Sequence, residues 1–179
     1  MEAGPHQQII QTPLVTLTPR GMLFLLVALN LTIIGGGRID GDLIALGTAG
    51  LLLGLMVIVF GKWNLRDIHL NLSAPSRVFA DTPFDLRLTQ LNKRSLFDAW
   101  STDLELNLSH APKIQTHVTW TAAGSSSSSK LRGSIAKRGA LSEHPCTLSS
   151  TFPLGLFRFL KKITLKHEIL VFPKPLLPK

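Results

Sequence analysis

The sequence of 179 residues contains a single cysteine, Cys146, so the chain cannot form an internal disulfide bond, which fits a reducing compartment. It lacks the short motifs of common catalytic and metal sites: the Gly-x-Ser-x-Gly elbow, the P-loop, His-Glu-x-x-His and Cys-x-x-Cys. It also has no helix-turn-helix, zinc-finger or RNA-binding signature. These absences predict a protein that is not an enzyme, has no cofactor, metal or small-molecule substrate, and does not bind nucleic acid.

Acidic residues are few, with eleven Asp or Glu against nineteen Lys or Arg. Asp85, Asp103 and Glu105 fall opposite the apolar positions of their segments or in turns, so we expect them to face solvent rather than to form an acid and base pair. His110 and His117 have no further ligands with which to hold a metal ion. Convergence of Asp98, Asp103 and His110 in one pocket would argue for an enzyme instead.

The positive charge is confined to one part of the chain. Residues 1–61 contain two Lys or Arg and three Asp or Glu, a net charge of −1. Residues 62–179 contain seventeen Lys or Arg and eight Asp or Glu, a net charge of +9. Anionic lipid attracts basic residues near its surface by about 1 kcal/mol each, so direct binding of headgroups is one predicted role for this part.

Residues 43–60 run without any charged side chain. As a helix rising ~1.5 Å per residue, such a segment reaches about 27 Å, close to the ~30 Å hydrocarbon thickness of a bilayer. A helix also satisfies its backbone hydrogen bonds internally, as lipid requires. The segment therefore predicts a transmembrane helix, against the alternative of a buried helix in a soluble domain.

A second apolar stretch covers residues 22–34 and reaches a useful length when Gly21 and residues 35–37 are included. A cleaved signal peptide is disfavoured, because Arg20 is the only positive charge before the stretch and no cleavage site follows it. The connector 35–42 is short and rich in turn formers, and its two aspartates are expected to terminate helices. Residues 21–61 thus predict an antiparallel transmembrane hairpin.

Flanking charge predicts the orientation of this hairpin. Arg20, Lys62 and Arg66 lie on the side of the chain ends, whereas the connector carries Arg38 alone. The positive-inside rule then places both termini in the cytoplasm, including an N-terminal cytoplasmic segment, residues 1–20.

Gly50 and Gly54 form a ridge of small residues in the second span. Such a ridge lets two helices approach closely. The nearest partner is the first span of the same chain, and the alternative is a homodimer formed through this face.

After residue 62 the apolar residues alternate with polar ones, which is typical of half-buried strands. The segments that show this pattern are 68–72, 84–88, 104–108, 114–120 and 163–171, with weaker candidates at 131–137 and 145–151. Turn residues separate them. The pattern predicts an all-β antiparallel sandwich of about seven strands, immunoglobulin-like, over residues 62–175, with a short tail at 176–179.

Three details of this region carry their own predictions. The serine run 125–129 is interpreted as a mobile hairpin tip, with a cluster of phosphorylation sites as the alternative. Trp120 follows Ile114, Thr116 and Val118 in the apolar alternation, so it is expected on the same face as they are. His167 falls on the inward face of its strand and is expected to be hydrogen-bonded in the core or an interface.

Several short stretches are more specific than these patterns. They are residues 18–21 (TPRG), 64–65 (NL), 77–80 (RVFA), 137–140 (KRGA), 151–159 (TFPLGLFRF) and 168–175 (EILVFPKP). In this order, around two spans, they resemble the membrane half of the domain-of-unknown-function 58 family. The resemblance covers nearly the whole chain.

Members of that family are bacterial membrane proteins in which a hairpin and a β-sandwich precede a larger domain similar to the von Willebrand factor A fold. They are commonly linked with a MoxR-type AAA+ ATPase and related membrane proteins. The resemblance implies a multi-pass location in the bacterial inner membrane and a similar association. The sequence stops at Lys179, where the larger domain would begin, so no ligand or metal residue is transferred from the family.

The stretch around residues 152–155 predicts a turn between two strands, because proline fixes one dihedral and Gly155 permits a positive one. One interpretation is a corner that closes the core. The other is a partner-docking edge, with exposed aromatics beside a basic rim of Arg158, Lys161 and Lys162. The candidate interface residues are Phe152, Pro153, Gly155, Phe157, Arg158 and Phe159.

Together these observations predict a non-enzymatic scaffold anchored in the membrane. It would be a subunit of a MoxR-type assembly or a short paralogue that competes for the same sites. Direct binding of anionic lipid is the alternative, and a strong dependence on salt would distinguish it.

Overall fold

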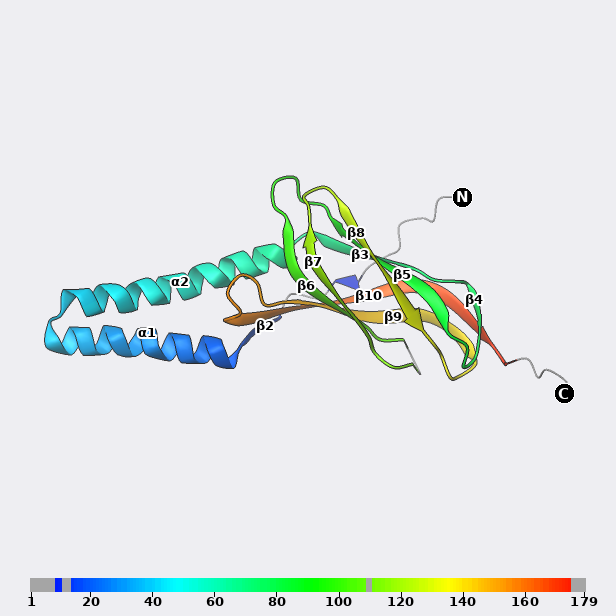
Figure 1. Ribbon diagram of the computed structural model, residues 1–179, viewed down its shortest axis with the longest axis horizontal. Helices are drawn as coiled ribbons and strands as arrows, with labels where there is room; N and C mark the ends of the chain where they lie inside the picture. The colour runs from blue at the N-terminus through cyan, green and yellow to red at the C-terminus, as the bar shows by residue number, and fades with distance from the viewer. Residues whose placement is uncertain (1–8, 11–13, 109–110, 175–179) are drawn as a thin grey trace. The chain divides into compact units, whose positions relative to one another are not determined.

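The computed structural model describes residues 9–10, 14–108 and 111–174 (Figure 1). The chain divides into two compact units, each described by itself below. The hairpin unit contains the described residues 14–66 and 150–160, and the β unit contains 67–149 and 161–174 with strand β1. His110, considered above as a metal ligand or catalytic residue, lies outside the described residues.

Two apolar helices dominate the hairpin unit, as predicted. Helix α1 spans Pro19–Arg38 and helix α2 spans Gly41–Leu65. Thr18 caps α1, accepting a hydrogen bond from the Gly21 N–H at 3.0 Å. Asp40 caps the start of α2 by accepting from the N–H groups of Asp42 and Leu43, so it lies at a helix end as expected. Asp42 lies inside the first turn of α2 instead. The hairpin therefore extends beyond the predicted limits of 21 and 61.

The connector is shorter than predicted, because its three glycines belong to helix α1. Only Ile39 and Asp40 join the helices, with Ile39 in the left-handed conformation at φ 56°. Gly35 has a packing role instead, since a Cβ there would stand 2.7 Å from the backbone nitrogen of Ile44. The prediction of a glycine turn was wrong because close helix packing also requires glycine.

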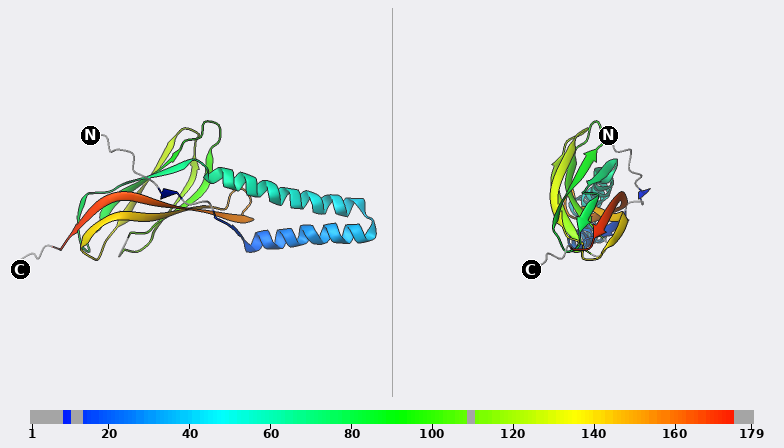
Figure 2. Two further views of the ribbon diagram at one scale, coloured as in Figure 1. Left: turned by 180° about the vertical axis from the view of Figure 1, so that it is seen from behind. Right: turned by 90° about the vertical axis from the view of Figure 1, so that its right-hand side faces the viewer.

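The β strands form two sheets (Figure 2). The strands of the larger sheet, in spatial order, are β1 Ile9–Ile10, β10 Phe157–Phe172, β9 Gly139–Ser150, β6 Ala99–Leu106 and β7 Ile114–Thr121. Strands β2 Leu14–Leu17 and β4 Arg77–Phe79 also pair with β10. The smaller sheet contains β3 Ile68–Ser73, β5 Phe84–Asn92 and β8 Ser126–Gly133. Strand β4 runs parallel to β10, whereas β5 runs antiparallel to both of its neighbours.

The core of the β unit lies between the inward faces of these sheets. Strand β3 contributes Ile68, Leu70 and Leu72, and β5 contributes Leu86 and Leu88. The larger sheet contributes the buried side chains of Leu104, Leu106, Leu148, Ile163, Leu165 and Ile169. The alternation that predicted β3, β5, β6 and β10 is thus confirmed, and the body is sandwich-like.

The serine run is not a loop tip. Ser126–Ser129 begin strand β8 and pair with β5, with Ser126 opposite Leu91 and Ser129 opposite Leu88. The Ser128 and Thr89 hydroxyls lie 3.0 Å apart and share a hydrogen bond across the strands. The prediction was wrong because the backbone of β5 supplies hydrogen-bond partners whatever the side chains are, while the turn falls at Gly124, with φ 68°.

The inward phase of strands β6 and β7 changes near one end of the pair. Val118 is buried, but Trp120, two residues further on, is 50% exposed, so its predicted inward position was wrong. On the facing strand, Ser101 adopts a positive φ of 45°. Thr102 is buried and Trp100 is exposed, so the chain reverses its phase at Ser101. This turns two tryptophans away from the core.

Candidate functional site

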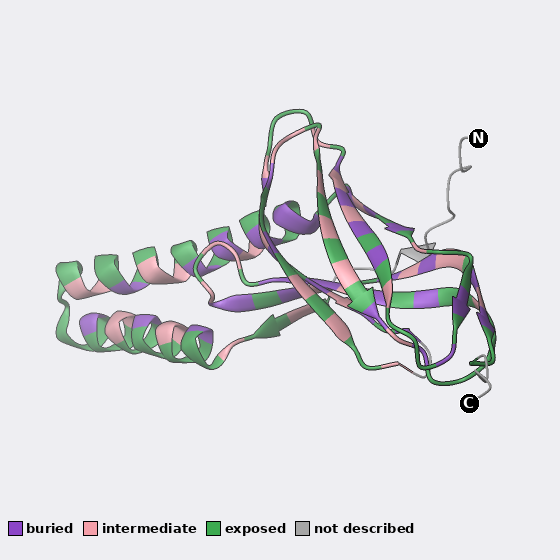
Figure 3. Ribbon diagram, turned by 45° about the vertical axis from the view of Figure 1, so that its right-hand side comes forward, coloured by how far each residue is buried: buried purple, intermediate pink, exposed green. Residues whose placement is uncertain are grey.

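The most extensive candidate surface of the chain is the outside of the helical hairpin. Large apolar side chains are exposed along both helices, for example Leu23 at 66% and Leu52 at 63%. The others are Met22, Leu26, Val27, Leu29, Ile33, Ile34, Leu46, Leu53, Leu55, Met56, Val59, Phe60 and Trp63. Figure 3 shows the helices mainly as exposed, with buried residues where they face each other. Both helices are long and apolar enough to cross a bilayer.

Polar side chains in these helices bond to the backbone of their own helix. Asn30 donates to the Leu26 carbonyl at 2.8 Å, and Thr32 donates to Ala28 at 3.0 Å. Thr48 in α2 donates in the same way to Ile44 at 2.7 Å. Satisfying polar groups within the helix suits an apolar environment, where water cannot compensate them.

The Gly50–Gly54 ridge faces helix α1 of the same chain. A Cβ at Gly50 would stand 3.0 Å from the Ala28 Cβ, and one at Gly54 would stand 2.9 Å from Leu25 Cδ2. Gly47 extends the ridge, because a side chain there would overlap Thr32. The prediction that this ridge packs inside the hairpin is confirmed.

The predicted turn at residues 152–155 forms the base of the hairpin unit. Gly155 has a φ of 70°, and its N–H donates to the Thr151 carbonyl at 2.8 Å. The Thr18 hydroxyl, which caps α1, lies 2.7 Å from the Gly155 carbonyl oxygen and 2.8 Å from that of Leu156. Strand β2 then pairs with the first residues of β10, Leu17 opposite Phe157. The corner is thus tied to the start of α1.

The docking-edge interpretation placed Phe157 and Phe159 among exposed aromatics, which is wrong. Phe157 is 6% exposed and Phe159 is fully buried, with the Phe159 ring against Gly61 of α2. Alternation could not show this, because it does not reveal which distant residue covers a strand. Phe152 and Pro153 are half-buried, whereas Arg158 and Leu154 are exposed.

A buried polar pair holds the same corner to helix α2. Asn64 Nδ2 donates to Ser150 Oγ at 3.1 Å, and Ser150 Oγ also accepts from the Phe152 N–H at 3.2 Å. Both Asn64 and Ser150 are buried. These contacts support the interpretation of residues 152–155 as a corner that closes a core.

Lys161, assigned above to the basic rim, is buried in the β unit. Its ammonium donates to the Ile68 carbonyl at 3.1 Å. Burial lowers the pKa of Lys161, and Asp67 acts in the opposite direction. Of the predicted rim, Arg158 and Lys162 are exposed.

The acidic residues considered for catalysis have structural partners. Asp103 contacts His117 Nδ1 at 2.7 Å on the solvent side of β6 and β7. Asp98 accepts from Trp120 Nε1 at 2.9 Å and from the Ala123 N–H at 2.8 Å, and these bonds lower its pKa. Among the described residues, no three His, Cys, Asp or Glu side chains gather where they could hold a metal ion.

Two histidines form hydrogen bonds with backbone carbonyls of other segments of the β unit. His167 Nε2 lies 2.9 Å from the Ala74 oxygen, which confirms the expected hydrogen-bonded histidine. His144 is fully buried, and its Nε2 lies 2.9 Å from the His167 oxygen. Burial lowers the pKa of His144. Its Nδ1 has no hydrogen-bond partner within the described part of the chain.

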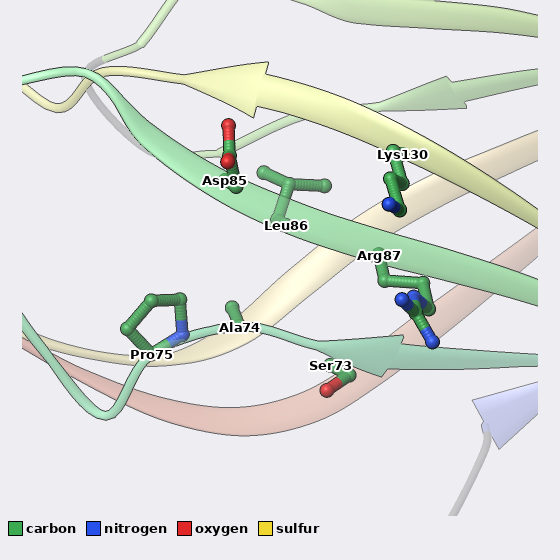
Figure 4. A pocket seen from close by; sticks show the side chains of 7 residues that line it. All are labelled: Ser73, Ala74, Pro75, Asp85, Leu86, Arg87 and Lys130. Carbon is green, nitrogen blue, oxygen red and sulfur yellow. The ribbon is translucent and has the colours of Figure 1, made fainter.

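A shallow depression of about 480 Å³ lies on the smaller sheet (Figure 4). Arg87 on β5 pairs with Ser73 on β3 and with Lys130 on β8, so two cations are cross-strand neighbours. Asp85 also lines the depression and bonds with Arg132 at 3.2 Å. This arrangement offers cationic donors and a hydroxyl to an anion at the surface.

Sequence reasoning missed a cluster at one end of the β unit. Leu96 is 82% exposed, and Phe97, Trp100 and Trp120 are also exposed. We call these four residues the aromatic rim. The signal that could have indicated it is the close succession of Leu96, Phe97 and Trp100 after the polar residues 92–95.

A polar network beneath the rim fixes its loop. Asn92 Nδ2 lies 2.9 Å from the Phe97 oxygen and 3.2 Å from the Thr121 oxygen, and Asn92 is buried. Arg94 Nε donates to Asn92 Oδ1 at 2.9 Å, and its Nη2 donates to the Asp98 carbonyl at 3.0 Å. The loop between β5 and β6 is therefore held by a network of part-buried hydrogen bonds from Asn92 and Arg94.

No protein-family model and no curated protein sequence matches the chain. Among solved structures, the CARDB domain of a Pyrococcus furiosus protein matches 59% of this chain and 94% of its own, with 8% identity and a TM-score of 0.39. A superoxide reductase (neelaredoxin) from Ignicoccus hospitalis matches 59% of this chain and 82% of its own, with 18% identity and a TM-score of 0.26. Scores this low carry no argument about fold or function.

Proposed function

We propose that the chain is a membrane-anchored scaffold, in which helices α1 and α2 cross a bilayer as a hairpin and the β unit holds a partner protein at its surface. The observation that carries the anchor is the apolar surface exposed along both helices. Soluble proteins rarely expose contiguous apolar patches of this extent. The internally bonded Asn30, Thr32 and Thr48 support the same environment.

The ends of the hairpin have the chemistry of a membrane interface. Helix α2 closes with exposed Phe60, Lys62 and Trp63, and α1 begins beside exposed Arg20. Tryptophan and basic residues are enriched at the boundary between lipid and water. The proposed orientation has the chain ends in the cytoplasm of a bacterium, with Arg38 near the outer side.

Cysteine labelling tests this orientation. In a Cys146→Ser background, Gly37→Cys places a thiol in the last turn of α1, next to the connector, where a Cβ has open space. Ser142→Cys places one on an exposed position of β9. An impermeant maleimide added to intact cells is expected to label the first variant and spare the second, and the reverse pattern would overturn the orientation.

The partner class proposed here is a MoxR-type AAA+ ATPase. It follows from the resemblance of residues 151–159 and 168–175 to the domain-of-unknown-function 58 family, and the immunoglobulin-like assignment of the two-sheet body belongs to the same proposal. Arg158 and Leu154 are exposed side chains of the corner that a partner could contact in this proposal. Phe157 and Phe159 are not contact residues in this proposal.

Affinity purification in mild detergent from native membranes tests the scaffold. We expect an AAA+ ATPase with the unmodified chain and its loss with Arg158→Glu. Lys130→Glu is the matched control, since it makes the same charge change on an exposed position of β8. A preparation without the ATPase would overturn the proposed partner, and retention in Arg158→Glu would overturn docking at the corner.

Direct binding of anionic lipid is a second candidate function. The observation that favours it is the cross-strand pair Arg87 and Lys130 in a region with a net charge of +9. Proteoliposomes with and without phosphatidylglycerol test it through protection of the β unit from proteolysis. Protection that disappears at high salt and in the double variant Arg87→Glu, Lys130→Glu would support lipid binding, and equal protection in neutral lipid would exclude it.

A further inference from the structure

The aromatic rim stands at the end of the β unit where the chain enters from helix α2. Asp67 directly follows Arg66, the C-cap of α2, and its carbonyl accepts from the Lys93 N–H at 3.2 Å. Ile68, the first residue of β3, pairs with Asn92, the last residue of β5. The loop that carries Leu96 and Phe97 therefore begins beside the first residues of the β unit.

The turn between β7 and β8 lies at this same end. The Gly124 N–H donates to the Arg94 carbonyl at 2.7 Å, and the Asn92 N–H donates to the Ser125 carbonyl at 3.0 Å. Trp120 precedes this turn and pairs with Trp100 across the strands. The centroids of their rings lie 6.3 Å apart. The rim thus comes from the β5–β6 loop, which carries Leu96 and Phe97, and from the paired strands β6 and β7, which carry Trp100 and Trp120. Backbone hydrogen bonds join that loop to the β7–β8 turn.

The fold directs the rim outward. The positive φ of Ser101 reverses the inward phase, so that Trp100 and Trp120 are exposed while Thr102 and Thr121 are buried. The Trp120 indole is anchored by its hydrogen bond to Asp98. A non-glycine residue in this conformation is uncommon and is often found at functional sites.

We propose that the aromatic rim inserts into the interfacial layer of the same bilayer that holds the hairpin, as a second membrane contact. This inference rests on the proposed transmembrane hairpin. The residue chemistry fits a lipid interface, because two tryptophans, a phenylalanine and a leucine stand beside exposed Lys93. The net charge of +9 after residue 61 complements an anionic leaflet. Because Asp67 directly follows the C-cap of α2, this end of the β unit is covalently joined to the end of the proposed membrane span.

Tryptophan quenching in proteoliposomes tests the insertion. The chain has three tryptophans, so Trp63→Phe leaves Trp100 and Trp120 as the reporters. The vesicles contain phosphatidylcholine and phosphatidylglycerol, with bromine placed either near the headgroup or near the end of the acyl chains. We expect stronger quenching by the shallow bromine, and loss of that quenching in the added double variant Leu96→Ser, Phe97→Ser.

A matched control uses another exposed aromatic residue of the β unit. Phe79 pairs with Phe172 at the end of β10, beyond the turn that follows β3. Phe79→Ser is expected to leave the quenching of Trp100 and Trp120 unchanged. Circular dichroism confirms that each variant is folded before its quenching is compared.

A second reporter separates this proposal from the anchor itself. With Trp100→Phe and Trp120→Phe, only Trp63 of α2 remains. Quenching of Trp63 without quenching of the rim tryptophans overturns the rim insertion and leaves the anchor standing. Absence of both signals overturns both. Rim emission that changes with protein concentration but not with brominated lipid assigns the rim to a second copy of the chain and also overturns the insertion.

Discussion

Gly21, in the first turn of helix α1, lies directly against the backbone carbonyl of Leu156, so that a Cβ on Gly21 would overlap the carbonyl oxygen. The same oxygen accepts from the Thr18 N–H at 3.1 Å. A backbone group cannot move aside as a side-chain tip can. The approach of these two residues therefore fixes how the corner meets the start of the hairpin.

Gly21→Ala is expected to destabilise the hairpin unit by about 1–3 kcal/mol, the usual range for overpacking. Gly36→Ala is the matched control, because a Cβ at Gly36 has no neighbour within 4 Å. Helix content followed by circular dichroism during thermal unfolding in detergent measures both. Equal transition temperatures for the two variants would refute the close contact.

Phe157 and Arg158 are adjacent in β10 but are expected to respond differently to substitution. Phe157→Ala removes a buried ring and is expected to cost about 3–5 kcal/mol of stability. Arg158→Glu changes an exposed side chain and is expected to stay within about 0.5 kcal/mol of the unmodified chain. Chemical unfolding in detergent distinguishes them, and a fully stable Phe157→Ala variant would contradict the buried corner.

Because His144 is buried, we expect the folded chain to lose stability in mild acid. Burial lowers the pKa of His144 below the ordinary value of 6.5, although the hydrogen bond with the His167 carbonyl acts in the opposite direction. The unfolded chain therefore binds a proton more readily as pH falls through about 6.5, and the free energy of unfolding decreases there, by up to ~1.4 kcal/mol per pH unit. Burial also lowers the pKa of His69, which adds to the trend.

Urea unfolding at neutral and mildly acidic pH, followed by tryptophan fluorescence in detergent, measures this loss. His144→Gln keeps an amide donor for the His167 carbonyl but does not titrate, so its stability should depend less on pH. His69→Gln should have the smaller effect, because His69 is only half-buried. An unchanged pH dependence in His144→Gln would remove His144 from this account.

Cys146 is expected to be unreactive in the folded chain. It is 1% exposed, and burial, with the nearby charge of Glu105, raises the pKa of its thiol to about 12. Maleimide at pH 8 should label it only after unfolding. Ser142→Cys, on an exposed position of β9, should add one label at once, and rapid labelling of the unmodified chain would show that the β unit opens.

Local patterns predicted much of the fold. The uncharged run 43–60 predicted α2, and alternation predicted β3, where Ile68, Leu70 and Leu72 are all buried. Such patterns predict the element correctly in these places because each face of the element lies in one kind of environment along its whole length. The ridge of Gly50 and Gly54 was predictable for a related reason, since its nearest partner is close in sequence.

The failures arise where distant residues decide the outcome. The serines of β8 look like a loop until the backbone of β5 is placed beside them. By alternation, Trp120 should face the core with Val118. The inward phase reverses there instead, next to Ser101 of the neighbouring strand, which has a positive φ. The burial of Phe159 depends on Gly61, which lies almost one hundred residues away. None of these relationships leaves a local signal.

The central claim, that α1 and α2 reside in a bilayer, is tested most directly by washing membranes that contain the full chain with alkaline carbonate and sedimenting them. We predict that the chain stays in the pellet and leaves it only with detergent. Recovery of the chain in the carbonate supernatant, as a folded monomer, would contradict the account.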